Sequence, residues 1–296
     1  MSAATGGPDS AGLAELACSV AREAGDLLAT RHGRVTVVET KSSPTDVVTE
    51  MDRAAEDLIR RRILAARPGD SILGEEGGQL DAPAGAAGGA GAPGGVPVRW
   101  IVDPLDGTVN YLYGLPDWAV SIAAEVDGAV VAGAVWVPAR GSLFTATAGG
   151  GAWLQRPGTA PAAAAQRLAC TSGVPLAAAL VGTGFGYEAG RRVVQGAVIA
   201  AVLPLVRDIR RGGSAAVDLC SVAAGRLDAF YERGLHAWDF AAGGLIAREA
   251  GAQVGGLHGR PASESMTLAA GPGLFAGLHD LLAGLDPERD AAAPGS

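Results

Sequence analysis

Segments with the apolar spacing of helices alternate along this chain with short runs typical of β-strands. The helices are expected over residues 13–31, 45–62, 191–206, 214–224 and 240–250. The strands are expected over residues 71–73, 99–102, 118–125, 130–137, 179–183, 208–210 and 227–231. A sheet whose strands alternate with helices buries its faces against them, so this pattern predicts an α/β fold in packed layers.

Two tracts of alanine, glycine and proline interrupt the alternation. They cover residues 81–97 and 157–165, and they carry no side chains large enough to fill a core. Both are therefore expected to be flexible surface loops. We place a boundary beside the second tract, between an N-terminal α+β half over residues 1–150 and a C-terminal α/β half over residues 151–296.

Charge and hydropathy narrow the class of protein. The chain has 296 residues, a net charge of −8 and an isoelectric point near 5.0, whereas a protein that grips nucleic acid usually has a basic surface. The uncharged run over residues 193–206 is too short to span a bilayer, and the first ten residues lack the pattern of a signal peptide. Cys18, Cys170 and Cys220 are typical of reduced cytosolic thiols. We therefore expect a soluble cytoplasmic protein that binds neither nucleic acid nor membrane.

The segment DPLDGTVN, at residues 103–110, directly follows a predicted strand. Its two carboxylates lie three residues apart, and with an inward backbone carbonyl they would suit a hard cation such as Mg²⁺. Gly107 lets a backbone N–H approach an anion closely, and a helix that begins near Thr108 would direct its positive end there. Asp, Pro and Gly also form ordinary turns, so this segment alone does not establish a site.

Three further acidic segments lie beside predicted strands or helices. GEEGG at residues 74–78 follows a strand, WDFAAG at 238–243 opens a helix, and KSSPTDVVTEMD at 41–52 precedes one. Taken singly, the glutamates could belong to a solvated loop and Asp239 could be a simple helix cap. Several carboxylates that met in one place without cations would repel one another strongly, so bound Mg²⁺ would be expected if these segments came together in the fold.

These segments, together with GSAAVDL at 213–219 and YERG at 231–234, resemble the inositol monophosphatase family of Mg²⁺-dependent, lithium-sensitive phosphatases. The resemblance covers residues 13–282, and the motifs occur in the order of the family. It implies the layered α/β/α/β/α sandwich of that family, which is the sugar phosphatase-like fold. It also implies a homodimer.

The resemblance assigns roles to individual positions. The metal ligands, for two or three Mg²⁺ ions, are Glu75, Asp103, the carbonyl of Leu105, Asp106 and Asp239. The residues that orient or support the attacking water are Asp46, Thr108 and Glu76. The substrate contacts are Glu75, Leu105, Asp106, Gly107, Thr108, Gly213, Ser214, Ala215, Glu232 and Asp239.

The implied reaction is the hydrolysis of a small alcohol phosphate monoester, with myo-inositol 1-phosphate as the favoured substrate. Such esters hydrolyse very slowly in water, and metal ions both activate a water and stabilise the leaving oxygen. We therefore expect direct attack by water without a covalent phosphoenzyme. Histidinol phosphate, a fructose bisphosphate and a 3′-phosphoadenosine nucleotide are alternative substrates on the same scaffold. A regulatory protein that binds the transcription machinery is a further alternative.

Three other residues are candidates for the neighbourhood of the site. Lys41 is the only lysine of the chain, and we predict that it lies near the acidic cluster and balances its charge. Arg211 either contacts substrate or a partner subunit, or forms a surface salt bridge. His236 precedes Asp239 by three residues and either lines the pocket or packs. The glycines over residues 182–186 are not spaced as in a dinucleotide-binding loop.

Overall fold

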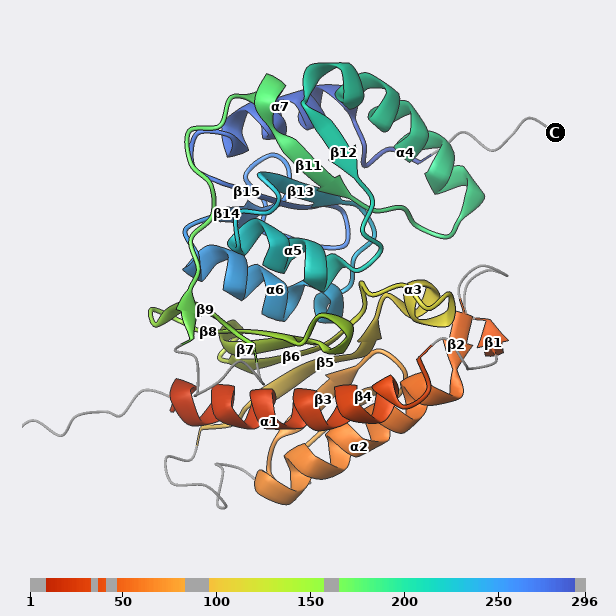
Figure 1. The fold of residues 1–296 in the computed structure, drawn as a ribbon, viewed down its shortest axis with the longest axis vertical. Coiled ribbons are helices and arrows are strands. Elements are labelled where there is room, and N and C mark those ends of the chain that lie inside the picture. Colours follow the sequence, from red (N-terminus) through yellow and green to blue (C-terminus); the bar gives the residue numbers. More distant parts are fainter. Residues whose placement is uncertain (1–8, 33–36, 41–46, 83–95, 157–164, 291–296) are drawn as a thin grey trace, which may run out of the picture.

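The computed structural model describes residues 9–32, 37–40, 47–82, 96–156 and 165–290. These residues form five layers, as Figure 1 shows: two helices, a sheet, two helices, a second sheet and two further helices. The expected α/β/α/β/α sandwich is confirmed. The outer helices on one side are α1 (Ser10–Ala29) and α2 (Glu50–Ala66), those in the middle are α5 (Ala215–Ala223) and α6 (Ala237–Glu249), and those on the other side are α4 (Ala189–Val202) and α7 (Phe275–Leu285).

The larger sheet has eight strands in the order β10-β9-β8-β7-β6-β5-β3-β4. Only β3 and β5 pair in parallel, and all other neighbours are antiparallel. Asp127 and Gly128 join β6 to β7 with φ of 50° and 77°, as a tight hairpin turn requires. The strands are β3 (Ser71–Gly74), β4 (Gly78–Leu80), β5 (Arg99–Asp106), β6 (Ala119–Val126), β7 (Ala129–Val137), β8 (Ser142–Thr147), β9 (Gly151–Gln155) and β10 (Gln166–Arg167).

The smaller sheet has five strands in the order β12-β11-β13-β15-β14. β11 is parallel to both of its neighbours, whereas β15 is antiparallel to β13 and β14. Its strands are β11 (Leu180–Thr183), β12 (Asp208–Arg210), β13 (Ala229–Glu232), β14 (Gln253–Gly255) and β15 (Thr267–Ala270). The remaining regular elements are the antiparallel pair β1 (Val37–Thr40) and β2 (Val47–Thr49), the short helix α3 (Thr108–Leu112), and 3₁₀ turns at Pro138–Arg140, Leu176–Ala178 and Leu203–Leu205.

Four apolar clusters fill the four interfaces between the layers. One lies between α1, α2 and the larger sheet around the fully buried Trp100, and a second lies on the opposite face of that sheet against α5 and α6. The third joins α5 and α6 to the smaller sheet around Phe230, and the fourth lies beneath α4 and α7. Small residues let these layers approach closely, because a Cβ added at Gly133 of β7 would lie only 3.1 Å from the Cα of Ala242 in α6.

The predicted helix over residues 45–62 is wrong at its start, because residues 47–49 form β2 and α2 begins at Glu50. The predicted helix over residues 191–206 ends early, at Val202, since a 3₁₀ turn containing Pro204 follows. The division at residue 150 stays a prediction, and both β9 and β10, which lie beyond that residue, pair in the larger sheet. Among the described helices, none is long and apolar enough to cross a membrane.

Candidate active site

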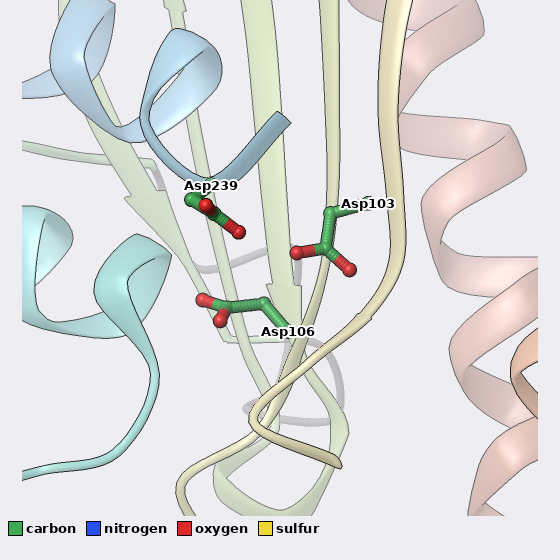
Figure 2. A group of neighbouring side chains, drawn as sticks. All are labelled: Asp103, Asp106 and Asp239. Atoms are coloured by element: carbon green, nitrogen blue, oxygen red, sulfur yellow. The ribbon is translucent and has the colours of Figure 1, made fainter. Parts of the chain in front are cut away.

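Asp103 and Asp106 both lie on β5, a strand of the larger sheet. Residues three apart on a regular strand point to opposite faces, but β5 carries a bulge here. Asp103 pairs with Ser121 and Asp106 with Ala119, so three steps along β5 match two steps along β6. Figure 2 shows the result: the two carboxylates and that of Asp239 converge, and one oxygen of each lies within 4.8 Å of the others.

Asp239 comes from the first turn of α6, where it holds the helix start in place. Its Oδ2 accepts a hydrogen bond of 2.6 Å from the backbone N–H of His236, the N-cap residue of α6. Asp239 is thus the third helical residue rather than the cap itself. Because an acidic group in the first turn also interacts favourably with the helix dipole, the sequence explains the position of this carboxylate locally.

Asp106 is fixed by the start of α5. Its Oδ2 accepts hydrogen bonds from the Ser214 hydroxyl at 2.6 Å and from the Ala216 N–H at 2.7 Å. The same Ser214 hydroxyl caps α5 by accepting from the Val217 N–H at 3.2 Å. The N-cap of α5 therefore positions a carboxylate of β5, which ties the larger sheet to the middle helix layer.

Asp103 and Asp106 are buried and Asp239 is half-buried, and all three lie among like charges. Burial raises the pKa of Asp103 well above its usual value, and the carboxylates of Glu75, Asp106 and Asp239 raise it further. Burial also raises the pKa of Asp239 well above its usual value and that of Asp106 to about 6, although the hydrogen bonds to Asp106 oppose part of the shift. Joint ionisation is therefore costly without a cation. Carboxylate oxygens are the ligands of hard divalent ions, so this cluster could hold a metal ion.

Thr108 begins α3 beside this cluster. Its hydroxyl oxygen lies 3.2 Å from Oδ1 of Asp52 and 3.1 Å from the carbonyl oxygen of Leu105. Asp52 lies in the first turn of α2 and is only 1% exposed, and the sequence analysis did not assign it a role. One sequence feature could have revealed Asp52: its carboxylate lies on the apolar face of a predicted helix, where an acid is rarely found without a partner.

The turn between β5 and α3 requires glycine at position 107. Gly107 has a φ of 93°, and a Cβ there would lie 2.8 Å from the carbonyl oxygen of Asp117. It would also lie 3.3 Å from the carbonyl oxygen of Gly213, so the turn packs against the segment that leads into α5. The backbone N–H groups of Gly107 and Thr108 thus stand at a turn that lines the cleft.

A cleft of about 420 Å³ contains most of the predicted site residues. Those that line it are Glu75, Asp103, Leu105, Asp106, Gly107, Thr108, Arg211, Gly213, Ala215, Glu232, His236 and Asp239. A larger and more open recess of about 580 Å³ lies along α1, and none of the predicted residues lines it. The carboxylate cluster therefore marks the smaller hollow as the candidate active site.

Some predicted residues lie elsewhere. Ser214 supports Asp106 instead of lining the cleft, and the backbone N–H of Glu76 donates to Oε2 of Glu56 at 2.8 Å. Asp46 and Lys41 lie outside the described residues. The roles predicted for all of these residues stay predictions.

The far wall of the cleft comes from the smaller sheet. Glu232 ends β13, where burial raises the pKa of its carboxyl to about 8 and the nearby Arg211 opposes part of that shift. A Cβ at Gly184 would overlap the Glu232 carboxylate, so the bare backbone after β11 leaves room for it. Phe185 and Gly186 line the same wall, although no sequence motif predicted a part for this loop in the site.

Most of the chain is similar to proteins of known family. Residues 9–287 match the inositol monophosphatase family. The inositol-1-monophosphatase of Mycobacterium leprae is 48% identical over 239 residues, which are 80% of this chain and 78% of that protein. The Escherichia coli Nus factor SuhB is 37% identical over 246 residues, or 82% of this chain and 85% of that protein. The structure of Mycobacterium tuberculosis SuhB superposes with a TM-score of 0.77 at 41% identity, and the match covers 96% of this chain and 100% of that one. The chain therefore belongs to the inositol monophosphatase family.

Proposed function

We propose that this protein hydrolyses phosphate monoesters of small alcohols in a Mg²⁺-dependent reaction, with myo-inositol 1-phosphate as the favoured substrate. The observation that carries the proposal is the convergence of three aspartates from β5 and α6 in one cleft, two of them buried and one half-buried. The similarity to the Mycobacterium leprae inositol-1-monophosphatase supports the substrate. Lithium inhibition, a cytoplasmic location and a homodimer belong to the same proposal.

The proposed metal site uses oxygen ligands from two layers. Glu75, Asp103, the carbonyl of Leu105, Asp106 and Asp239 would hold two or three Mg²⁺ ions. Bound Mg²⁺ would supply Lewis-acid stabilisation of the charge on the phosphate and lower the pKa of a water. The buried aspartates fit this role because a cation relieves the repulsion that raises their pKa values.

Further residues of the cleft would bind and orient the reactants. The backbone N–H groups at Gly107 and Thr108 would donate to the phosphate, as N–H groups at a turn before a helix do. The Thr108 hydroxyl would orient the attacking water together with Asp46 and Glu76, and Asp52 would hold that hydroxyl in place. The alcohol would lie against Gly213, Ala215 and Glu232 on the far wall.

The name of the Escherichia coli relative favours a second candidate, a regulatory protein that contacts the transcription machinery. The net charge of −8 argues against direct nucleic-acid contact, so such a role would use a protein partner. It would not exclude catalysis, because every carboxylate of the predicted metal site is present in the sequence.

A phosphate-release screen tests the proposal. Purified protein is assayed with Mg²⁺, and separately with chelator, against myo-inositol 1-phosphate, histidinol phosphate, fructose 1,6-bisphosphate and 3′-phosphoadenosine 5′-phosphate. We expect Mg²⁺-dependent release with the highest kcat/KM for myo-inositol 1-phosphate. A hundredfold preference for another compound would overturn the substrate, and no release from any compound would favour the regulatory role.

A further inference from the structure

A small pocket lies behind the far wall of the cleft. Gly184, Phe185, Glu232 and Arg233 line both hollows, so these four residues form the partition between the pocket and the cleft. Further lining of the pocket comes from α4 and β13. The space open to the centre of a water molecule is about 10 Å³, which is enough for about one water.

Two polar atoms of side chains that line this pocket are buried without a partner. Nε2 of Gln195 in α4 and the hydroxyl oxygen of Tyr231 in β13 form no hydrogen bond within the described ranges of the chain. Gln195 is only 8% exposed and Tyr231 only 4%. Buried donors and acceptors in native proteins nearly always have a partner. Two of them at one pocket therefore point to a ligand that forms hydrogen bonds there.

The neighbouring protein groups do not supply these partners. Oε1 of Gln195 accepts from the backbone N–H of Gly186 at 3.1 Å, so an amide flip that moved Nε2 would lose this bond. The Thr183 hydroxyl donates to the backbone carbonyl oxygen of Tyr231 at 2.9 Å. Burial raises the pKa of the Tyr231 phenol to about 12, although nearby Thr183 opposes part of the shift. The phenol therefore stays neutral and can both donate and accept.

We propose that the pocket binds one water molecule, which accepts a hydrogen bond from Gln195 and shares one with Tyr231, and that this water holds the far wall of the cleft in place. Water fits the space and can form both bonds. A metal cation is disfavoured, because the amide N–H groups are donors and not ligands. The inference rests on the proposed function, in which the alcohol lies against this wall.

The water would connect the two segments that build the wall. The pairing of β11 with β13 ends at Thr183 and Tyr231, and Gly184 places no side chain between the following loop and Glu232. Gln195 already holds that loop, and the water would tie the same side chain to β13. A bridging water is nearly as favourable as a direct hydrogen bond. Gln195 and Tyr231 are thus positioning residues, which act on the alcohol through the wall.

A crystal structure of the unaltered protein with Mg²⁺, at a resolution that defines ordered waters, tests the site. One peak of density should lie about 2.7–3.2 Å from both Nε2 of Gln195 and the hydroxyl oxygen of Tyr231. In Tyr231→Phe the water loses a partner, so the peak should weaken or vanish. The absence of a peak in the unaltered protein would overturn the inference, and so would an unchanged peak in Tyr231→Phe.

Steady-state kinetics with myo-inositol 1-phosphate test the positioning role. Tyr231→Phe should raise KM about three- to tenfold and change kcat less than about twofold, because the wall moves while the metal site does not. Gln195→Leu should raise KM at least as much, since it also removes the acceptor that holds Gly186. The double variant should match Gln195→Leu, because both substitutions remove the same water. Effects on KM that multiply in the double variant would contradict a shared water.

Tyr113→Phe is the matched control, because Tyr113 is 79% exposed, lines neither hollow and loses the same hydroxyl. It should leave KM and kcat unchanged. A lower melting temperature in Tyr231→Phe with an unchanged KM would mean that the water only stabilises the fold, which would overturn its role in the wall. No hydrolysis of any compound by the unaltered protein would instead overturn the proposed function, and the density would still decide whether the water is bound.

Discussion

The two sheets supply the two walls of one cleft, and they do so by different means. The wall from the larger sheet carries Asp103 and Asp106, whose positions are fixed by a bulge and by hydrogen bonds to the start of α5. The wall from the smaller sheet carries Glu232 and the loop after β11, where bare glycine backbone leaves space for larger side chains. One wall is defined by a bulge and by hydrogen bonds that Ser214 and Ala216 donate to Asp106, the other by the absence of Cβ atoms.

This difference suggests a division of labour between the walls. Carboxylates that must share a cation tolerate little movement, since the distance from each ligand oxygen to the metal ion varies within a narrow range. In the wall that contains glycines, replacement of one neighbouring side chain can change the shape of the cleft, because no Cβ atoms hold that space. We therefore expect substitutions in the first wall to abolish turnover of every substrate, and substitutions in the second wall to alter which alcohol is accepted.

The largest effect is expected for Asp103→Asn. Loss of one carboxylate from the cluster should lower kcat for all substrates by about 10³-fold or more, because metal stabilisation of the transition state is worth several kcal/mol. The melting temperature of the metal-free protein should not fall, since the raised pKa shows that the ionised group is disfavoured in the fold. Asp127→Asn, in the exposed β6–β7 turn, is the control and should change neither quantity. Retained turnover in Asp103→Asn would refute the assigned site.

Gly107→Ala should have the next largest effect. The positive φ and the contact with the Asp117 carbonyl should together cost about 1–3 kcal/mol of stability, and displacement of the turn should lower kcat about tenfold or more. Gly128→Ala is a matched control, because φ is 77° there and no atom lies within 4 Å of the added Cβ. Gly128→Ala should lower the free energy of unfolding through backbone strain but leave kcat unchanged. Equal kinetics for the two variants would mean that the turn at residue 107 does not position the reactants.

Glu232→Ala tests the second wall. Loss of hydrogen bonds to substrate hydroxyls should raise KM for myo-inositol 1-phosphate about tenfold while kcat changes less. Glu232→Gln should recover part of the loss, and Glu264→Gln, at an exposed position of the same cleft, should have little effect. A fall in kcat as large as that of Asp103→Asn would contradict the division between the walls.

The smallest effect concerns the pH dependence of stability without metal. Burial raises the pKa of Asp106 to about 6, that of Asp218 to about 7 and that of Glu232 to about 8. These values lie above those of the unfolded chain, so protonation stabilises the fold fully at low pH and this contribution is lost as pH rises through 6 to 8. In chelator, the melting temperature should be several degrees lower at pH 8 than at pH 5, and Mg²⁺ should restore it most at pH 8. A melting temperature that rises over this range would contradict the assignment of these buried acids.

The acidic motifs could be predicted from sequence because each is a local pattern. DPLDGTVN follows a strand and WDFAAG opens a helix, and the structure brings Asp103, Asp106 and Asp239 together. The layered fold was predictable for the same reason, since alternating periodicity survives in a chain rich in alanine and glycine. What local patterns could not reveal is the bulge in β5, which depends on pairing with β6.

Other elements escaped prediction because their sequences lack a strong periodic signal. β14 and β15 are short: β15 is buried and pairs with β13 and β14, whereas β14 pairs with β15 at the edge of the sheet and stays partly exposed. Asp52 stands on the apolar face of its helix, but only the fold shows that Thr108 is its partner. Such positions are set by tertiary contacts, which no window of sequence contains.

The packing of the middle helices constrains how the sequence of this enzyme can evolve. α5 and α6 lie between two sheets, and they pack so closely that a Cβ at Gly243 would lie 2.9 Å from the Cβ of Leu219. The same two helices begin at the groups that hold Asp106 and Asp239. A change of volume deep in this layer would therefore shift the carboxylates relative to one another. Mutations that impair catalysis without touching substrate should accumulate there, and selection for activity would preserve the small buried residues of this layer.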